Sequence, residues 1–177
     1  GGTALRFDIV ELCAYDLLIL KRPGAERDHP KARIEAARAR LAAMTESDLA
    51  RLERNLIEWV PAREFVYDRQ SFRRMLDTYR DISIDGFRAN LFEFLSEIVP
   101  VAEEEGVRLA IHPDDPPFPI FGLPRVVSTA SDACALLAAQ PSPSNGLTLC
   151  TGSYGANGKN DLVAMANPSL YVSNPID

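Results

Sequence analysis

The sequence predicts an α/β protein with parallel strands, because helices alternate with short apolar strands throughout its second half. From about residue 84 the predicted order is helix, strand, loop, helix, strand, loop and helix, which is the alternation of a parallel α/β sheet or barrel. Charged amphipathic helices occupy much of the first half. The 177 residues are 46% hydrophobic, which is enough apolar side chain to bury a domain-sized core.

The first predicted helix spans residues 30–43. Residues 1–28 mix apolar and charged residues without a clear periodicity, so no secondary structure is predicted there apart from a turn at residues 21–24. Pro30 suits the first turn of a helix. Apolar side chains then recur at helical spacing among Arg and Glu, at Ile34, Ala37 and Leu41.

Two further amphipathic helices are predicted before residue 80. Thr45 and Asp48 resemble a capping box, and the apolar stripe that follows ends at Pro61. The stripe consists of Leu49, Leu52, Leu56, Ile57 and Val60. A weaker pattern predicts a helix over 69–79. None of these helices carries residues typical of catalysis, so we interpret them as packing elements.

A longer apolar helix is predicted over residues 84–105, with Pro100 as a kink and Gly106 as its C-terminal stop. The predicted apolar stripe consists of Phe87, Leu91, Phe94, Leu95, Ile98, Val101 and Ala102. The remaining elements are predicted as strand 107–111, helix 131–139, strand 147–150 and helix 160–166.

Charge and cysteine content exclude several classes of protein. The net charge is −6, from 19 basic and 25 acidic residues, and the basic residues are scattered, which argues against nucleic acid as a partner. No apolar run reaches the roughly 20 residues of a membrane span, and charges interrupt residues 1–20, so we expect neither a membrane segment nor a signal peptide. Three widely spaced cysteines, Cys13, Cys134 and Cys150, make a poor disulfide framework, which favours a reduced cytoplasmic protein.

Two candidate metal ligands follow directly from the predicted strands. His112 comes after the first strand, where a neutral imidazole can bind a divalent metal. The alternative is a histidine at a barrel rim whose ring nitrogens are hydrogen-bonded within the protein. Cys150 ends the second strand, 38 residues and one βα unit later, so the two side chains are expected on neighbouring strands at the same rim. The alternative for Cys150 is a small buried hydrophobe, which is also our interpretation of Cys13 and Cys134. His29, beside Pro30, is expected in a capping or solvent-exposed position.

The segment after His112 offers polar candidates with open alternatives. Asp114 and Asp115 are either paired acid/base carboxylates or a loop face, and the flanking prolines favour the loop. Arg125 either binds a substrate carboxylate or forms a surface ion pair. The glycine-rich residues 152–155 match neither a P-loop nor a dinucleotide fingerprint, so we expect only a tight turn there.

Several motifs closely resemble the bacterial mannonate dehydratase family of hexuronate breakdown. They are AIHPDDPP at 110–117, GLPRVVST at 122–129, CTGSYG at 150–155, ALRFD at 4–8 and ILKRPGAE at 19–26. The resemblance covers about residues 3–166. It implies a xylose-isomerase-like TIM barrel that dehydrates D-mannonate to 2-keto-3-deoxy-D-gluconate, with a divalent metal held by two histidines, a cysteine and an aspartate. The histidine of HPDDPP maps onto His112 and the cysteine of CTGSYG onto Cys150.

The resemblance also implies that the barrel is partial, since a complete one needs about 250 residues. Residues 1–82 correspond to a helical insertion of the barrel, 83–166 to its central βα units and 167–177 to an atypical tail. The N- and C-terminal barrel strands, the other two metal ligands and the acid/base groups are expected outside this sequence. We therefore expect the chain alone to be inactive.

The resemblance implies Mn2+ as the metal, with Fe2+ as the alternative, and D-mannonate as the small-molecule partner of a cytoplasmic homo-oligomer. Asp114, Arg125 and Ser153 are the expected substrate contacts. Two other classes stay open at this point. One is a sugar isomerase or epimerase on a related barrel, and the other is a truncated, noncatalytic α/β fragment that self-associates to cover its sheet edges.

Overall fold

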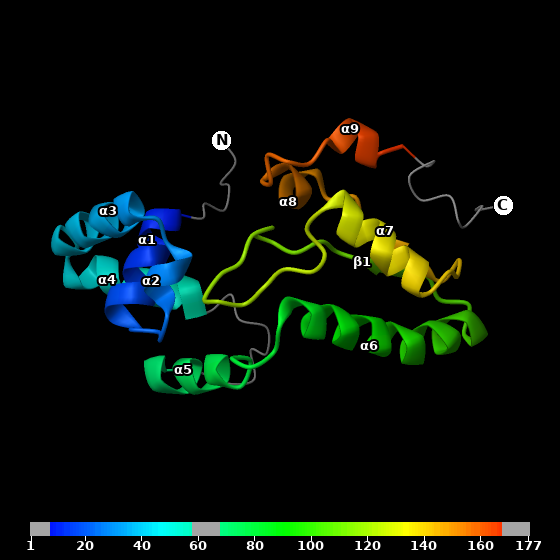
Figure 1. Ribbon diagram of the computed structural model, residues 1–177, viewed down its shortest axis with the longest axis horizontal. Coiled ribbons are helices and arrows are strands. Elements are labelled where there is room, and N and C mark those ends of the chain that lie inside the picture. The colour runs from blue at the N-terminus through cyan, green and yellow to red at the C-terminus, as the bar shows by residue number, and fades with distance from the viewer. Residues whose placement is uncertain (1–7, 58–67, 168–177) are drawn as a thin grey trace. The chain divides into compact units, whose positions relative to one another are not determined.

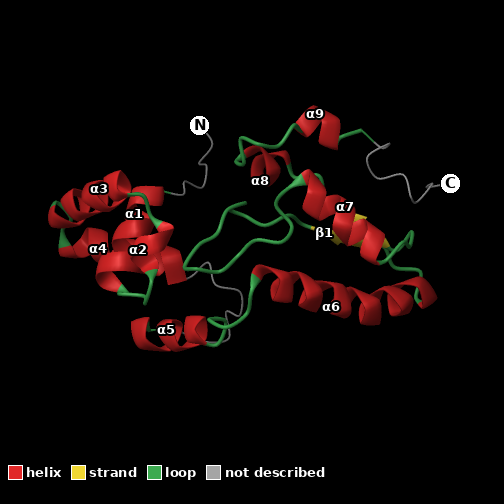
Figure 2. Cartoon of the chain, in the orientation of Figure 1, coloured by secondary structure: helices red, strands yellow, loops and turns green. Residues whose placement is uncertain are grey.

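The structure is a computed structural model that describes residues 8–57 and 68–167. Helices predominate, and the described strands are short (Figure 2). None of the helices in these ranges combines the length and apolar character needed to cross a membrane.

The chain divides into two compact units. The first holds the chain up to Asp81 together with Phe121–Leu123, and the second holds Ile82–Ile120 and the chain from Pro124 onward. The tip of the loop that follows His112 therefore belongs to the first unit, although its two flanks belong to the second.

The first unit is helical (Figure 1). Its elements are α1 (Ile9–Cys13), the π-helix η1 (Ala14–Ile19), α2 (Ala25–Asp28), α3 (Lys31–Ala42), α4 (Glu46–Ile57) and α5 (Arg69–Asp77). The turn predicted at residues 21–24 is confirmed, with positive φ at Lys21 (52°) and Gly24 (83°). Helix α3 is also confirmed, and α5 confirms the predicted helix but ends two residues early.

Helix α4 begins with the predicted capping box. The Asp48 amide donates to Thr45 Oγ1 (3.2 Å), and the Thr45 amide donates to Asp48 Oδ2 (3.1 Å). These two bonds satisfy donors that the helix geometry leaves open. The predicted C-terminal part of this helix, at 58–60, lies outside the described residues.

Two clusters form the core of the first unit. Cys13, Ala14 and Ala37 are fully buried where α1 and η1 pack on α3. The ring of Phe121 lies edge-on to those of Tyr15 (6.2 Å) and Phe72 (5.2 Å). These edge-to-face contacts bury the aromatic side chain at the loop tip.

The second unit contains a parallel two-stranded sheet. Its elements are α6 (Ile84–Glu104), β1 (Leu109–Ile111), α7 (Ala130–Ala139), β2 (Asn145–Leu147), α8 (Thr151–Gly155) and α9 (Leu162–Met165). Leu109 pairs with Asn145 and Ile111 with Leu147. Helix α7 connects the two strands, so the predicted βαβ order of a parallel α/β protein is confirmed.

Helix α6 ends as predicted but packs on a partly different face. Gly106 has a φ of 65°, and the Val107 amide donates to Ala102 O (2.7 Å), which closes a Schellman turn. Leu95 and Val99 join the core with Leu136 of α7.

The predicted apolar stripe of α6 is wrong at two positions. Phe94 is 57% exposed and Val101 58% exposed, whereas Val99, which was not in the predicted stripe, is buried. The reason is that α6 carries apolar residues around more than half of its circumference, and helical periodicity alone does not say which part is covered.

The second strand ends at Leu147, three residues earlier than predicted. The Thr148 amide still donates to Ile111 O (2.8 Å) before the chain leaves the ladder. Cys150 then occupies the N-cap position of α8. The tight turn predicted at 152–155 is also wrong, because these residues are helical and neither Gly152 nor Gly155 has a positive φ.

Candidate functional site

The two predicted metal ligands lie together. Because β1 and β2 are parallel neighbours, the residues that follow them emerge at the same end of the sheet. His112 follows β1 directly and Cys150 follows β2 by three residues. The two side chains are near enough to influence each other, since Cys150 helps to raise the pKa of His112 and His112 helps to lower that of Cys150.

A backbone contact fixes the orientation of the His112 ring. Its Nδ1 lies 2.8 Å from the carbonyl oxygen of Pro113. Since a carbonyl can only accept, Nδ1 carries the proton in this contact, and Nε2 is the ring nitrogen that could bind a metal.

Cys150 has the chemistry of a thiolate ligand. Its pKa is lowered to about 7, first by the hydrogen bond from the Ser153 hydroxyl, and then by the Ser153 amide and the His112 side chain. The thiolate is the form of cysteine that binds metals. Desolvation lowers the pKa of His112, but its contacts with Cys150 and Pro113 O outweigh this effect, so the net pKa is raised.

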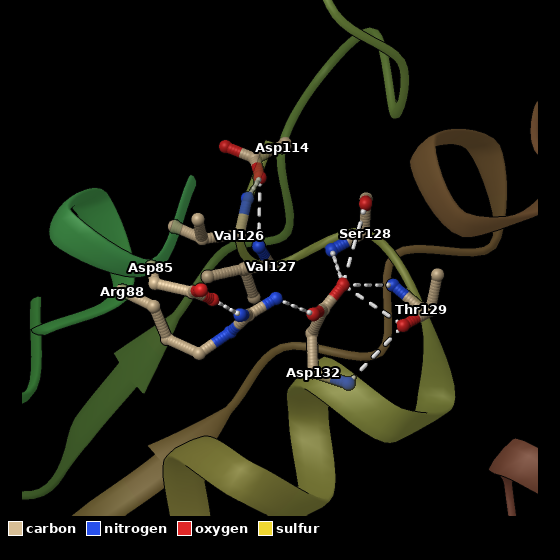
Figure 3. Close-up of polar contacts among 8 residues, drawn as sticks. All are labelled: Asp85, Arg88, Asp114, Val126, Val127, Ser128, Thr129 and Asp132. Carbon is tan, nitrogen blue, oxygen red and sulfur yellow. Dashed lines mark hydrogen bonds and ion pairs between the residues drawn. The ribbon is translucent and has the colours of Figure 1, made fainter. Parts of the chain in front are cut away.

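Asp114 is built into the loop that follows His112 (Figure 3). Its Oδ2 accepts hydrogen bonds from the amides of Val126 (2.9 Å) and Val127 (2.8 Å). This bonding matches the loop alternative of the sequence analysis. Asp115, its neighbour, is exposed.

Arg125 lies on the same loop and is partly buried. Its Nε is 3.4 Å from the Phe118 carbonyl, and its Nη1 is 3.9 Å from Asp114 Oδ1. Burial lowers the pKa of the guanidinium. Both contacts are long, and the other guanidinium donors have no protein partner among the described residues.

Ser153 is almost fully buried, at 2% exposed. Its hydroxyl donates to the sulfur of Cys150 at 3.3 Å. The structure therefore places Ser153 next to the candidate ligand Cys150 and shields it from solvent.

Asp132 is an organising residue that the sequence analysis did not single out. Its Oδ2 accepts from the amides of Ser128 (3.2 Å) and Thr129 (3.0 Å), and its Oδ1 pairs with Arg88 (3.2 Å), as Figure 3 shows. Thr129 and Asp132 form a complete capping box for α7. The Thr-x-x-Asp spacing before an apolar run is the signal that predicts this pair.

The prediction that His29 caps a helix or faces solvent is wrong as regards its side chain. His29 is 9% exposed, and its Nε2 lies 3.1 Å from Oδ2 of Asp16, which is 1% exposed. Arg22 also binds Asp16, through Nε (2.8 Å) and Nη2 (2.7 Å). The side chain was misplaced because its burial depends on partners that local sequence does not identify.

The donor set for a metal is partial. Across 8–57 and 68–167, no three His, Cys, Asp or Glu side chains lie close enough together to hold a metal ion. His112 and Cys150 form a pair of nitrogen and sulfur donors.

A histidine and a cysteine that meet at the end of neighbouring parallel strands define an α/β protein with a candidate metal site at the strand ends. The family model for D-mannonate dehydratase (UxuA) matches residues 1–170. The chain therefore belongs to the mannonate dehydratase family.

Curated relatives agree with this assignment. Mannonate dehydratase of Saccharophagus degradans is 53% identical over 166 residues, and mannonate dehydratase 2 of Agrobacterium fabrum is 52% identical over 165 residues. These matches cover 94% and 93% of this chain but 42% of each relative. The chain thus spans less than half the length of the curated relatives it matches.

A solved structure resembles part of the chain. The crystal structure of mannonate dehydratase from Streptococcus suis matches with a TM-score of 0.50 and 42% sequence identity. The match covers 57% of this chain and 28% of that one.

Proposed function

We propose that this chain supplies part of the active site of a mannonate dehydratase, a hydro-lyase that converts D-mannonate to 2-keto-3-deoxy-D-gluconate in hexuronate catabolism. The observation that carries the proposal is that His112 and Cys150 follow neighbouring parallel strands at the same end of the sheet. Family membership supports it.

The proposed architecture is part of a TIM-type barrel. The parallel β1–α7–β2 unit supports it, because such units repeat around a barrel and active-site residues follow the strands. The helical residues 1–82 are the proposed insertion, 83–166 the central βα units and 167–177 a tail.

His112 Nε2 and Cys150 Sγ are the proposed protein ligands of a divalent metal, Mn2+ or alternatively Fe2+. The donor set fits, because imidazole nitrogen and thiolate both bind such ions. An open metal site normally keeps at least three protein ligands, so we place the remaining ligands in other segments of the full-length protein.

The reaction requires loss of a weakly acidic proton beside a carboxylate and departure of hydroxide. When bound, the metal supplies the positive charge that stabilises negative charge on the substrate oxygens. Arg125, with donors to spare, is the proposed partner of the substrate carboxylate. Asp114 contributes by closing the loop that carries Arg125. The proton-transfer groups are proposed to lie in other segments.

The complete enzyme is proposed to be a cytoplasmic homo-oligomer. The three cysteines support a reducing compartment, because none of them forms a disulfide within the described residues.

A chimera tests the proposal. The chain replaces the matching segment of the Saccharophagus degradans relative, and formation of the keto-deoxy acid is measured with a coupled assay. We expect an active chimera that loses at least about 100-fold of its activity with His112→Ala or Cys150→Ser, since even outer-shell changes cost 10–100-fold. Cys134→Ser, which alters a cysteine in α7, is the matched control. Full activity of both ligand variants would exclude this metal site.

A second candidate is a noncatalytic fragment that self-associates. The exposed side chains of Phe94, Val101 and Val107 favour it, because each is at least half exposed. Sedimentation of the chain at increasing concentration tests this candidate. A concentration-dependent oligomer that Phe94→Asp dissolves supports it, whereas a monomer at all concentrations excludes it.

A further inference from the structure

The side chain of Ser153 is hydrogen-bonded to the sulfur of Cys150, one of the two candidate metal ligands. Its hydroxyl is buried and donates to that sulfur at 3.3 Å. A buried hydroxyl that loses its acceptor pays a desolvation cost. The fold therefore favours arrangements in which the sulfur stays within reach of the hydroxyl.

The helix that carries Ser153 is braced on two sides. The Tyr154 amide donates to Cys150 O (3.0 Å), which fixes the first turn of α8. The side-chain amide of Asn160 donates to the carbonyls of Tyr154 (2.9 Å) and Ser128 (2.9 Å). Ser153 thus presents its hydroxyl from a turn that Asn160 ties to the segment before α7.

The two candidate ligands have comparable support. His112 Nδ1 is held by the Pro113 carbonyl, and Cys150 Sγ is held by the Ser153 hydroxyl. Outer-shell hydrogen bonds of this kind orient a metal ligand and tune its electron donation.

We propose that Ser153 is a positioning residue that orients the Cys150 thiolate toward His112 and tunes it as a metal ligand. The inference rests on the proposed function. It replaces the expectation that Ser153 contacts substrate, because a hydroxyl that is buried and donated to sulfur is not available to a sugar acid.

Cadmium binding tests this role without enzymatic turnover. Cd2+ is added to the reduced chain, and the thiolate-to-metal absorption band and the dissociation constant are measured for the unaltered chain and for Ser153→Ala. We expect the variant to bind Cd2+ about 10–100-fold more weakly. We also expect its band to move to lower energy, because the sulfur lone pair loses a hydrogen bond. A merely structural role would not shift the band.

Two controls separate the explanations. Ser131→Ala removes an exposed hydroxyl from α7 and is expected to change neither quantity. Far-UV circular dichroism shows whether Ser153→Ala folds, and the band position of the cadmium-saturated variant reports on the sulfur even if the variant is less stable.

The outcomes are distinguishable. A Cd2+–thiolate band with the same energy and affinity in Ser153→Ala overturns the role of Ser153 and leaves the metal site intact. If Cys150→Ser leaves the band of the unaltered chain unchanged, or if that chain shows no band, the metal site is wrong and the inference falls with it.

Discussion

Asp114 and Val127 are joined by a reciprocal pair of hydrogen bonds. The Asp114 amide donates to Val127 O (2.9 Å), and the Val127 amide donates to Asp114 Oδ2 (2.8 Å). The pair closes the loop that lies between β1 and α7, so the loop returns beside the end of β1, where His112 lies.

Asp114→Ala is expected to destabilise the protein by about 1–3 kcal/mol, because the two amides that it serves, on Val126 and Val127, lose an acceptor. Asp114→Asn keeps one carbonyl oxygen and is expected to cost less. Urea unfolding of the two variants measures both values. Equal stability of all three proteins would show that water replaces the carboxylate without cost.

Gly122 is expected to tolerate alanine poorly. Its φ is 76°, and an added Cβ would lie 2.6 Å from Arg22 Nη1. Arg22 cannot move away freely, because it is paired with Asp16 and Asp28. Gly122→Ala should therefore cost more than the roughly 1–2 kcal/mol of a left-handed alanine alone.

Two other glycines serve as matched controls for that substitution. Gly106 has a φ of 65°, but an added Cβ would meet no atom within 4 Å. Gly106→Ala is therefore expected to lower stability only by the cost of a left-handed alanine. Gly158 has neither a positive φ nor a neighbour close to the added Cβ, so Gly158→Ala is expected to be neutral or slightly stabilising. Thermal unfolding ranks the three variants, and any other order of stabilities contradicts the packing argument.

Thr129→Ala is expected to cost about 1 kcal/mol, because it removes the side-chain half of the capping box of α7. Thr129→Ser retains the hydroxyl and should recover most of the loss. Hydrogen exchange of the first turn of α7 is the direct measurement. Equal protection in the alanine and serine variants would mean that the cap contributes nothing.

Asp16→Asn is expected to destabilise the first unit by about 1–3 kcal/mol, because Arg22 and His29 lose a buried anionic partner while Arg22 keeps its pair with Asp28. Arg40→Ala breaks an ion pair with Glu11 that is largely exposed, and is expected to change stability little. Chemical denaturation compares the two. A loss for Asp16→Asn no larger than for Arg40→Ala would show that the buried cluster does not stabilise the unit.

Local signals predicted much of the secondary structure. The Thr45–Asp48 capping box and the Gly106 stop are set by residues within a few positions of each helix end, so the sequence contains the whole cause. The juxtaposition of His112 and Cys150 was predicted as well, because parallel strands joined by one helix bring their ends to the same edge.

Features that depend on distant partners escaped prediction. The burial of His29 is decided by Asp16 and Arg22, and the covered face of α6 is decided by α7. The sequence suggested that Ser153 belongs to a glycine-rich turn. In the structure it lies in α8, and its hydroxyl donates to the sulfur of Cys150, the N-cap residue of the same helix. Such contacts are specified by packing and not by spacing along the chain.

Because Phe121–Leu123 belongs to the first unit, the polypeptide passes from one unit to the other three times. A protease cut between Asp81 and Ile82 would therefore leave both pieces held together through the ring of Phe121 between Tyr15 and Phe72. Nicked chains should migrate as one species until denaturant releases that aromatic side chain.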